Sequence, residues 1–204
     1  MDARVLVLDG AMGTQIQEAD LTLEDFAGHE NCSEILLETR PDFVRSVHEA
    51  YLEVGCHAIE TNTFGANKLV LSEFGLESKT RELNRLGAVI AREACERHWR
   101  SGDPRFVIGS LGPGTNLVTL GHTDYDTLVD SYAEQVRGLL DGGVDAILVE
   151  TCQDILQVKA AVAATNTAFR EYDKKLPIFC QVTMETTGTM LVGTDIAAAL
   201  AALE

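Results

Sequence analysis

The segment 144–154, which reads Val-Asp-Ala-Ile-Leu-Val-Glu-Thr-Cys-Gln-Asp, constrains the fold of this chain most strongly. Its four consecutive apolar residues, 146–149, are typical of a strand that is buried on both faces, as in a parallel sheet. Glu150 follows them directly. A charge at that position adds nothing to packing, whereas the carboxyl ends of barrel strands carry chemistry. We therefore expect Glu150 to line a ligand site.

The same alternation of short apolar runs and longer amphipathic segments extends along the chain. It predicts strands at 4–8, 57–61, 106–110, 146–149 and 177–183. It predicts helices at 33–39, 41–54, 67–74, 79–99, 125–141, 154–169 and 196–204. In the helix 41–54, the residues expected to face the core are Phe43, Val44, Val47, Tyr51 and Val54. Regular alternation of this kind indicates a parallel sheet with right-handed crossovers.

Composition and charge exclude several classes of function. The 204 residues are 46% hydrophobic and carry a formal net charge of −16, which argues against nucleic acid, whose phosphates require a basic footprint. No apolar run is long enough to span a bilayer, and the N-terminus lacks a signal-peptide pattern. The five cysteines are odd in number and irregularly spaced, which favours a reducing cytoplasm over a disulfide framework.

Two architectures fit this alternation. A doubly wound sheet can be complete with five strands, whereas a (β/α)8 TIM barrel needs eight strands and about 250 residues. Functional-looking groups at successive strand ends, Asp9, Glu60, Ser110 and Glu150, favour the barrel. We therefore predict one domain, 1–204, that holds about five β/α units of a barrel. Because a partial barrel exposes strand edges, we expect these residues to be the N-terminal part of a longer chain.

The turn Gly10-Ala11-Met12-Gly13 follows the first predicted strand and Asp9. Glycines there allow backbone N–H groups to point into a cleft and receive an anion such as a carboxylate. An ordinary turn fits the spacing equally well. The pattern is not Gly-x-Gly-x-x-Gly, and the loop 111–116 lacks the lysine of a P-loop, so neither predicts a nucleotide site.

Five motifs in one order carry a family resemblance. They are Leu8-Asp9-Gly10-Ala11-Met12-Gly13-Thr14, Thr39-Arg40-Pro41-Asp42, Glu60-Thr61-Asn62-Thr63-Phe64-Gly65-Ala66-Asn67, Gly109-Ser110-Leu111-Gly112-Pro113 and Glu150-Thr151. Together they resemble the homocysteine-binding (homocysteine S-methyltransferase) module of cobalamin-dependent methionine synthases. The resemblance covers essentially the whole chain, and its most specific part begins at Glu60.

The resemblance implies a methyltransferase barrel in which zinc activates the thiol of homocysteine. The thiolate then attacks methylcobalamin bound on another module, forming methionine. The implied partners are homocysteine and the cobalamin-binding and folate-binding modules of the same long chain. The substrate amino group would be held by Asp9 and Glu150, and the substrate carboxylate by the amides of Gly10, Ala11, Met12 and Gly13. Thr63 and Ser110 lie on matching loops.

The resemblance places no catalytic residue and no metal ligand within this segment. The family's three zinc cysteines would lie beyond residue 204, and none of Cys32, Cys56, Cys95, Cys152 and Cys180 matches them. Cys152 follows the Glu150 strand and could approach the pocket. We expect no turnover from these residues alone.

Two other functions remain open at the level of sequence. One is a zinc-dependent homocysteine S-methyltransferase that takes its methyl group from betaine or S-methylmethionine without cobalamin. The other is a non-catalytic binding protein that has kept only this half-barrel.

Overall fold

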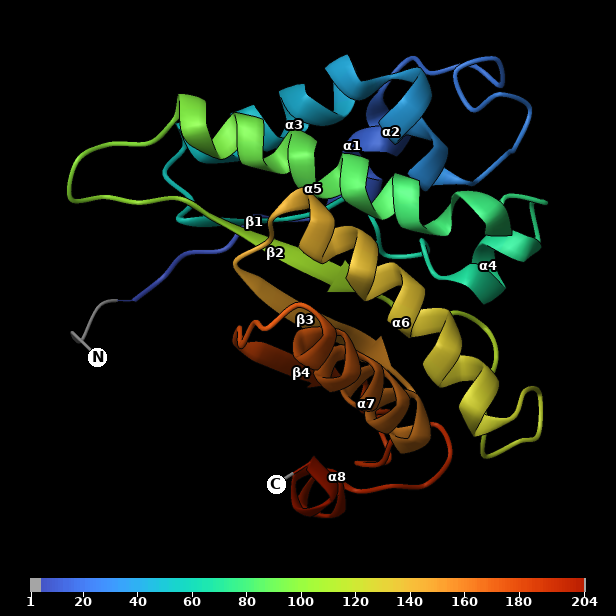
Figure 1. Ribbon diagram of the computed structural model, residues 1–204. Coiled ribbons are helices and arrows are strands. Elements are labelled where there is room, and N and C mark those ends of the chain that lie inside the picture. The colour runs from blue at the N-terminus through green and yellow to red at the C-terminus, as the bar shows by residue number, and fades with distance from the viewer. Residues whose placement is uncertain (1–4, 204) are drawn as a thin grey trace.

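The computed structural model describes residues 5–203 and contains one parallel sheet (Figure 1). Its strands are β1 (Ala58–Glu60), β2 (Phe106–Leu111), β3 (Ala146–Cys152) and β4 (Ile178–Val182). They are hydrogen-bonded in the order β1-β2-β3-β4, and every pair is parallel. A doubly wound sheet reverses its strand order at a switch point, whereas the wall of a barrel does not. The order is therefore that of a barrel wall, as predicted.

The helices follow the predicted alternation. They are α1 (Met12–Glu18), η1 (Ser33–Ile35), α2 (Leu36–Thr39), α3 (Pro41–Glu53), α4 (Lys68–Ser72), η2 (Glu77–Lys79), α5 (Thr80–Arg97), α6 (Tyr125–Gly142), α7 (Ile155–Glu171) and α8 (Ile196–Leu203). Every predicted helix is present with its ends shifted by a few residues, and α1 is additional. In Figure 1, α3, α5, α6 and α7 lie on the same side of the sheet.

Local sequence signals set the helix ends. Pro41 begins α3, where its missing N–H costs no hydrogen bond. The Asp124 carboxylate caps α6 by accepting from the Thr127 amide at 2.8 Å. Gly143 ends α6 with a left-handed φ of 87°. One core prediction was wrong: Val54 is 82% exposed, because α3 ends before it and the chain turns away.

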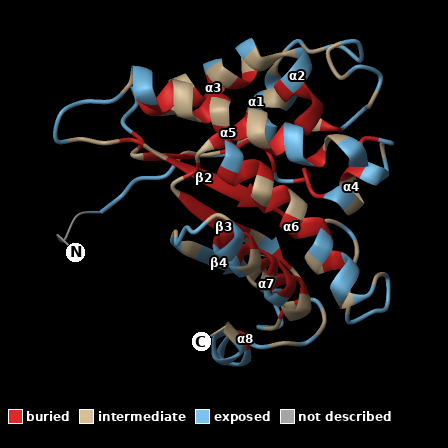
Figure 2. Ribbon diagram, viewed as in Figure 1, coloured by how far each residue is buried: buried red, intermediate tan, exposed pale blue. Residues whose placement is uncertain are grey.

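The main core lies between the sheet and this layer of helices. Ile59, Val107, Ile147 and Val149 alternate along the strands and are fully buried against α5, α6 and α7. Figure 2 shows this buried layer running through β2 and β3, with exposed residues on the outer helix faces. Burial of each such aliphatic side chain contributes roughly 1.5–3 kcal/mol.

The predicted strand 4–8 does not form in the described residues. Its only ladder contact is a single parallel bridge from Leu8 to Ala58, and residues 5–8 are exposed. The reason lies in His57, whose ring nitrogen Nδ1 accepts from the Val7 amide at 3.0 Å. This bond diverts an amide that a regular strand would use in the ladder. The segment still follows β1 closely enough to bring Asp9 to the end of the sheet.

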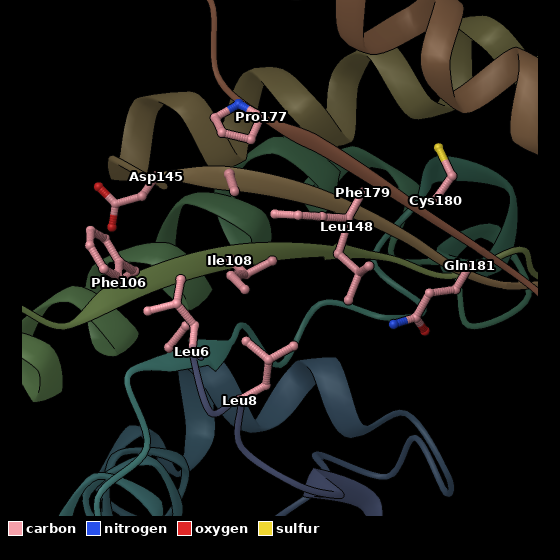
Figure 3. A pocket seen from close by; sticks show the side chains of 12 residues that line it. Leu6, Leu8, Phe106, Ile108, Asp145, Leu148, Pro177, Phe179, Cys180 and Gln181 are labelled. Carbon is pink, nitrogen blue, oxygen red and sulfur yellow. The ribbon is translucent and has the colours of Figure 1, made fainter. Parts of the chain in front are cut away.

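The other face of the sheet is open and apolar. A cleft of about 710 Å³ runs along this face, and the side chains that point into it include Leu6, Leu8, Ile108 and Leu148 (Figure 3). These positions alternate with the residues that face the helices, as the strand period of two requires. This face corresponds to the interior of a barrel.

The amino end of the sheet is held by a paired charge. Asp145 immediately precedes β3, and its Oδ2 accepts from Arg92 at 2.6 Å and from the Val107 amide at 2.8 Å. A carboxylate thereby joins β3 to β2 while an arginine neutralises it.

Candidate functional site

The carboxyl ends of the strands form a polar cleft of about 430 Å³. Its lining residues are Asp9, Gly10, Ala11, Met12, Gly13, Ser33, Glu60, Thr61, Asn62, Phe64, Ser110 and Glu150. The structure thus brings together Asp9, the turn 10–13, Ser110 and Glu150, which are far apart in sequence. It does not bring Thr63 into the lining.

Glu150 is held in place by its neighbour on β2. The Ser110 hydroxyl donates to Oε1 of Glu150 at 2.5 Å. Ser110 is itself buried, and its amide donates to the Thr61 hydroxyl at 3.1 Å. The Glu150 carboxylate is therefore oriented by a residue that is fixed in turn. Glu150 lies within β3, which continues to Cys152, so the strand runs three residues further than its apolar run indicated.

Two further carboxylates face Glu150. Asp9 accepts from the Glu60 amide at 3.0 Å, yet burial dominates and raises the pKa of Asp9 to about 7. Burial, followed by the charges of Glu150 and Asp9, raises the pKa of Glu60 to about 7. The lining residues include no lysine, arginine or histidine. Three acids without a cationic neighbour favour the binding of a positively charged group.

The glycine turn forms the adjoining wall. It leads into α1, and the first amides of a helix have no partner within the helix. The Tyr51 hydroxyl of α3 donates to the Ala11 carbonyl at 3.3 Å. A Cβ at Gly10 would lie 3.0 Å from the same hydroxyl oxygen, so glycine allows this close contact. The turn that leads into α1 therefore adjoins the three carboxylates in the lining of one cleft.

Thr63 lies behind the cleft and is fully buried. Its hydroxyl is 2.6 Å from that of Thr61 and donates to the Ser110 carbonyl at 2.9 Å. Gln135 of α6 donates to the Thr63 carbonyl at 2.8 Å. The contacts of Thr63 support the loop that carries the site and give it no access to the cleft.

Sequence reasoning missed several residues of the site. Glu60 was noted as a strand end without a site role, and Tyr51 only as a core residue. Glu34 is buried, and its Oε1 accepts from the Gly65 amide at 2.7 Å, which fixes the loop after β1. Burial also raises the pKa of Glu34. A glutamate directly before the apolar run 35–37 was the available signal for this contact.

The cysteines do not assemble into a metal site. Within residues 5–203, no group of three or more histidine, cysteine, aspartate or glutamate side chains is placed to hold a metal ion. Cys152 is fully buried in the core on the helix side of the sheet and does not line the cleft. The described residues therefore do not fit a zinc ion.

The barrel order, the single open face and a polar cleft at the strand ends define the class as a (β/α) barrel, present in part. The chain matches the family described as homocysteine S-methyltransferase over residues 6–204, and it belongs to that family.

Relatives and solved structures agree with this assignment. The chain is 53% identical to the methionine synthase of Mycobacterium leprae (strain TN) over 201 residues, 98% of this chain. It is 52% identical to that of Mycobacterium tuberculosis (strain ATCC 25618 / H37Rv) over its whole length. It spans only 17% of the length of either relative.

The fold is similar to that of a homocysteine methyltransferase from Escherichia coli. The oxidized form superposes with a TM-score of 0.80 at 23% identity, and this chain covers 69% of that structure. The metallated form also gives 0.80, with 71% of that structure covered. Among the described residues, none of the helices has the length and hydropathy needed to cross a membrane.

Proposed function

We propose that residues 1–204 are the N-terminal part of the homocysteine-binding barrel of a cytoplasmic methionine synthase. The observation that carries this proposal is the cleft itself, in which Glu150, oriented by Ser110 at 2.5 Å, faces Asp9 beside the glycine turn. A free α-amino acid has a cationic and an anionic group on one carbon. The cleft has carboxylates on one wall and the glycine turn on the adjoining wall, so a single cleft can receive both groups.

In this proposal Asp9 and Glu150 accept hydrogen bonds from the ammonium group of homocysteine. The amides of Gly10, Ala11, Met12 and Gly13 bind its carboxylate. Ser110 orients Glu150, and Thr63 supports the loop from behind. Charge-assisted hydrogen bonds of this kind are about twice as strong as neutral ones.

In this proposal the sulfur of homocysteine is activated by residues in other parts of a longer protein. A thiolate is the reactive form of homocysteine, and zinc would favour it outright. The cysteines described above do not form a zinc site, so they are given no part in activating the thiol. The proposal places the zinc ligands, the methylcobalamin and the cobalamin- and folate-binding modules in other parts of a longer protein.

The relatives support this function over its alternatives. Both mycobacterial proteins named methionine synthase are more than half identical to this chain, whereas the E. coli homocysteine methyltransferase is 23% identical and supports the fold alone. A cobalamin-independent enzyme shares the barrel, so the methyl donor is the feature that separates the two functions.

Binding of homocysteine to the full-length protein tests the proposal. Glu150→Gln is expected to weaken binding by roughly 1–3 kcal/mol in isothermal titration calorimetry, because a charge-assisted hydrogen bond is lost. Glu96→Gln, on the exposed face of α5, is the control and should bind as the unaltered protein does. Equal affinity in both variants would contradict the assignment of Glu150.

A further inference from the structure

The peptide groups of Ser110 lie just beyond the last regular pairing of β1 with β2. Glu60 ends β1 and pairs with Ile108, two residues before Ser110. The Thr61 amide still donates to the Ile108 carbonyl at 2.9 Å, as a parallel ladder requires. One further step of that ladder would join the Ser110 amide to the Thr61 carbonyl and the Thr63 amide to the Ser110 carbonyl.

The chain does not form these two bonds, because their partners on the β1 side are already bonded to each other. The Thr63 amide donates to the Thr61 carbonyl at 2.8 Å, in a three-residue turn that follows β1. The two side chains act in place of the backbone. The Ser110 amide donates to the Thr61 hydroxyl at 3.1 Å, and the Thr63 hydroxyl donates to the Ser110 carbonyl at 2.9 Å. Each hydroxyl therefore replaces a backbone group of its own residue.

The two hydroxyls are also bonded to each other, with their oxygens 2.6 Å apart. A hydroxyl has one proton and a carbonyl only accepts, so the Thr63 proton goes to the Ser110 carbonyl. Thr61 must therefore be the donor to Thr63. The bonds form a closed ring from the Ser110 amide through both threonines to the Ser110 carbonyl, and bonds in such a chain strengthen one another.

This ring holds the side of Ser110 that faces β1. Alternate residues of a strand bond to opposite neighbours, and the Val107 carbonyl accepts from the Asp145 amide on the β3 side. Ser110 is three residues from Val107 and therefore faces the other neighbour, beyond the end of β1. Its hydroxyl donates to Oε1 of Glu150 at 2.5 Å. A shift of the Ser110 backbone would consequently change the position of the hydroxyl that orients Glu150.

We propose that Thr61 is a positioning residue for substrate binding. Together with Thr63 it fixes the backbone of Ser110, and Ser110 in turn orients Glu150. Thr61 is in the lining of the cleft, but it is only 4% exposed and its proton is donated to Thr63. Its role is therefore exerted through Ser110. The inference rests on the proposed function, because its effect on the substrate passes through Glu150.

The test uses the full-length protein and the dissociation constant for homocysteine, measured by calorimetry. Thr61→Val keeps the shape of the side chain and removes the hydroxyl, so it is expected to raise that constant about three- to tenfold. Thr61→Ser keeps the hydroxyl and should bind about as tightly as the unaltered protein. Thr165→Val is the matched control, because Thr165 of α7 is also buried and its hydroxyl donates to the Ala161 carbonyl at 2.7 Å, outside the cleft. It should leave homocysteine binding unchanged.

A double substitution distinguishes positioning from a direct contact with the substrate. In the Ser110→Ala background, Thr61→Val should raise the dissociation constant little further, because the hydroxyl that Thr61 positions is already lost. A direct contact between Thr61 and homocysteine would leave the effect of Thr61→Val undiminished. Thr63→Val breaks the same ring at the Ser110 carbonyl, so it should also weaken binding, and it replaces Thr61→Val if that variant does not fold.

Several results would overturn the inference. They are normal binding by a folded Thr61→Val or Thr63→Val variant, an equal loss of affinity in Thr61→Ser or Thr165→Val, and effects of Thr61→Val and Ser110→Ala that add fully. Unchanged affinity in both Ser110→Ala and Glu150→Gln would instead overturn the proposed function.

Discussion

The Ser110 hydroxyl lies 2.5 Å from Oε1 of Glu150 and joins β2 to β3 in the wall of the cleft. The two residues come from neighbouring parallel strands, so the sheet itself sets their separation. Ser110 is 2% exposed and cannot turn toward solvent. The bond therefore fixes one direction for the Glu150 carboxylate before any ligand arrives.

Removing this hydroxyl should weaken the site through Glu150. Ser110→Ala is expected to reduce homocysteine affinity by about 1–2 kcal/mol, measured by calorimetry, since a hydrogen bond to a charged group is lost. The loss should be smaller in the Glu150→Gln background, where the charged acceptor is absent. Ser46→Ala, on the outer surface of α3, is the control. Full additivity of the Ser110 and Glu150 effects would show that the two residues act independently.

Homocysteine binding should strengthen as pH rises from 6 to 8. Burial raises the pKa values of Asp9, a proposed acceptor of the substrate ammonium, and of the neighbouring Glu60 to about 7, so a rise through that range adds negative charge to the cleft. Binding should then release protons, which calorimetry in two buffers of different ionisation enthalpy detects. Asp9→Asn should flatten the dependence. Affinity that is constant across this range would contradict the pairing of these acids with a cation.

Without ligand, folding stability should change in the opposite direction. The folded pKa of Asp9 lies above its ordinary value of 3.8, so the folded protein binds more protons between about pH 4 and 7. The free energy of unfolding should consequently fall as pH rises through this window. Urea denaturation at pH 5 and pH 8 measures the difference, and Asp9→Asn should reduce it. A difference that is unchanged in Asp9→Asn would place its origin in other groups.

Gly87→Ala should destabilise the protein although alanine favours a helix. A Cβ at Gly87 of α5 would lie 2.6 Å from Cγ2 of Thr63. Overpacking of this kind costs about 1–3 kcal/mol, which outweighs the ~1 kcal/mol that alanine gains in a helix. Thr63→Ser removes that methyl group and keeps the hydroxyl. Gly87→Ala should therefore cost less in the Thr63→Ser background, as measured by thermal denaturation, and an equal cost would exclude the contact as the cause.

Local patterns predicted most of the fold. The apolar run 146–149 and the glycines that end α6 are short-range signals, and β3 forms where they indicate. The segment 4–8 has the same apolar character, yet its pairing depends on a ring nitrogen of His57, fifty residues away. β3 also carries a bulge, in which Glu150 and Thr151 oppose the single residue Gln181 of β4, and this bulge depends on the register of β4, which no local pattern encodes.

The candidate site was predictable where strand geometry alone places a residue. Asp9, Ser110 and Glu150 each follow or end a strand predicted from the sequence, and parallel strands bring such positions to one edge. Thr63 does not line the cleft, because it lies three residues beyond the end of β1, where the loop turns back toward α6. Tyr51 and Glu34 were not predicted to support the site because their contacts with its loops are long-range in sequence.

Asp9 and Asp145 make the same contact at opposite ends of the sheet, each accepting a backbone amide of the neighbouring strand. Arg92 neutralises Asp145, whereas the lining of the cleft offers Asp9 no cation. A bound ammonium group would neutralise Asp9 as Arg92 neutralises Asp145. The melting temperature of the protein should thus rise with the concentration of its substrate. A ligand at 100 times its dissociation constant adds about 2.7 kcal/mol to the free energy of unfolding. Screening amino acids by thermal shift would then reveal which of them the cleft accepts.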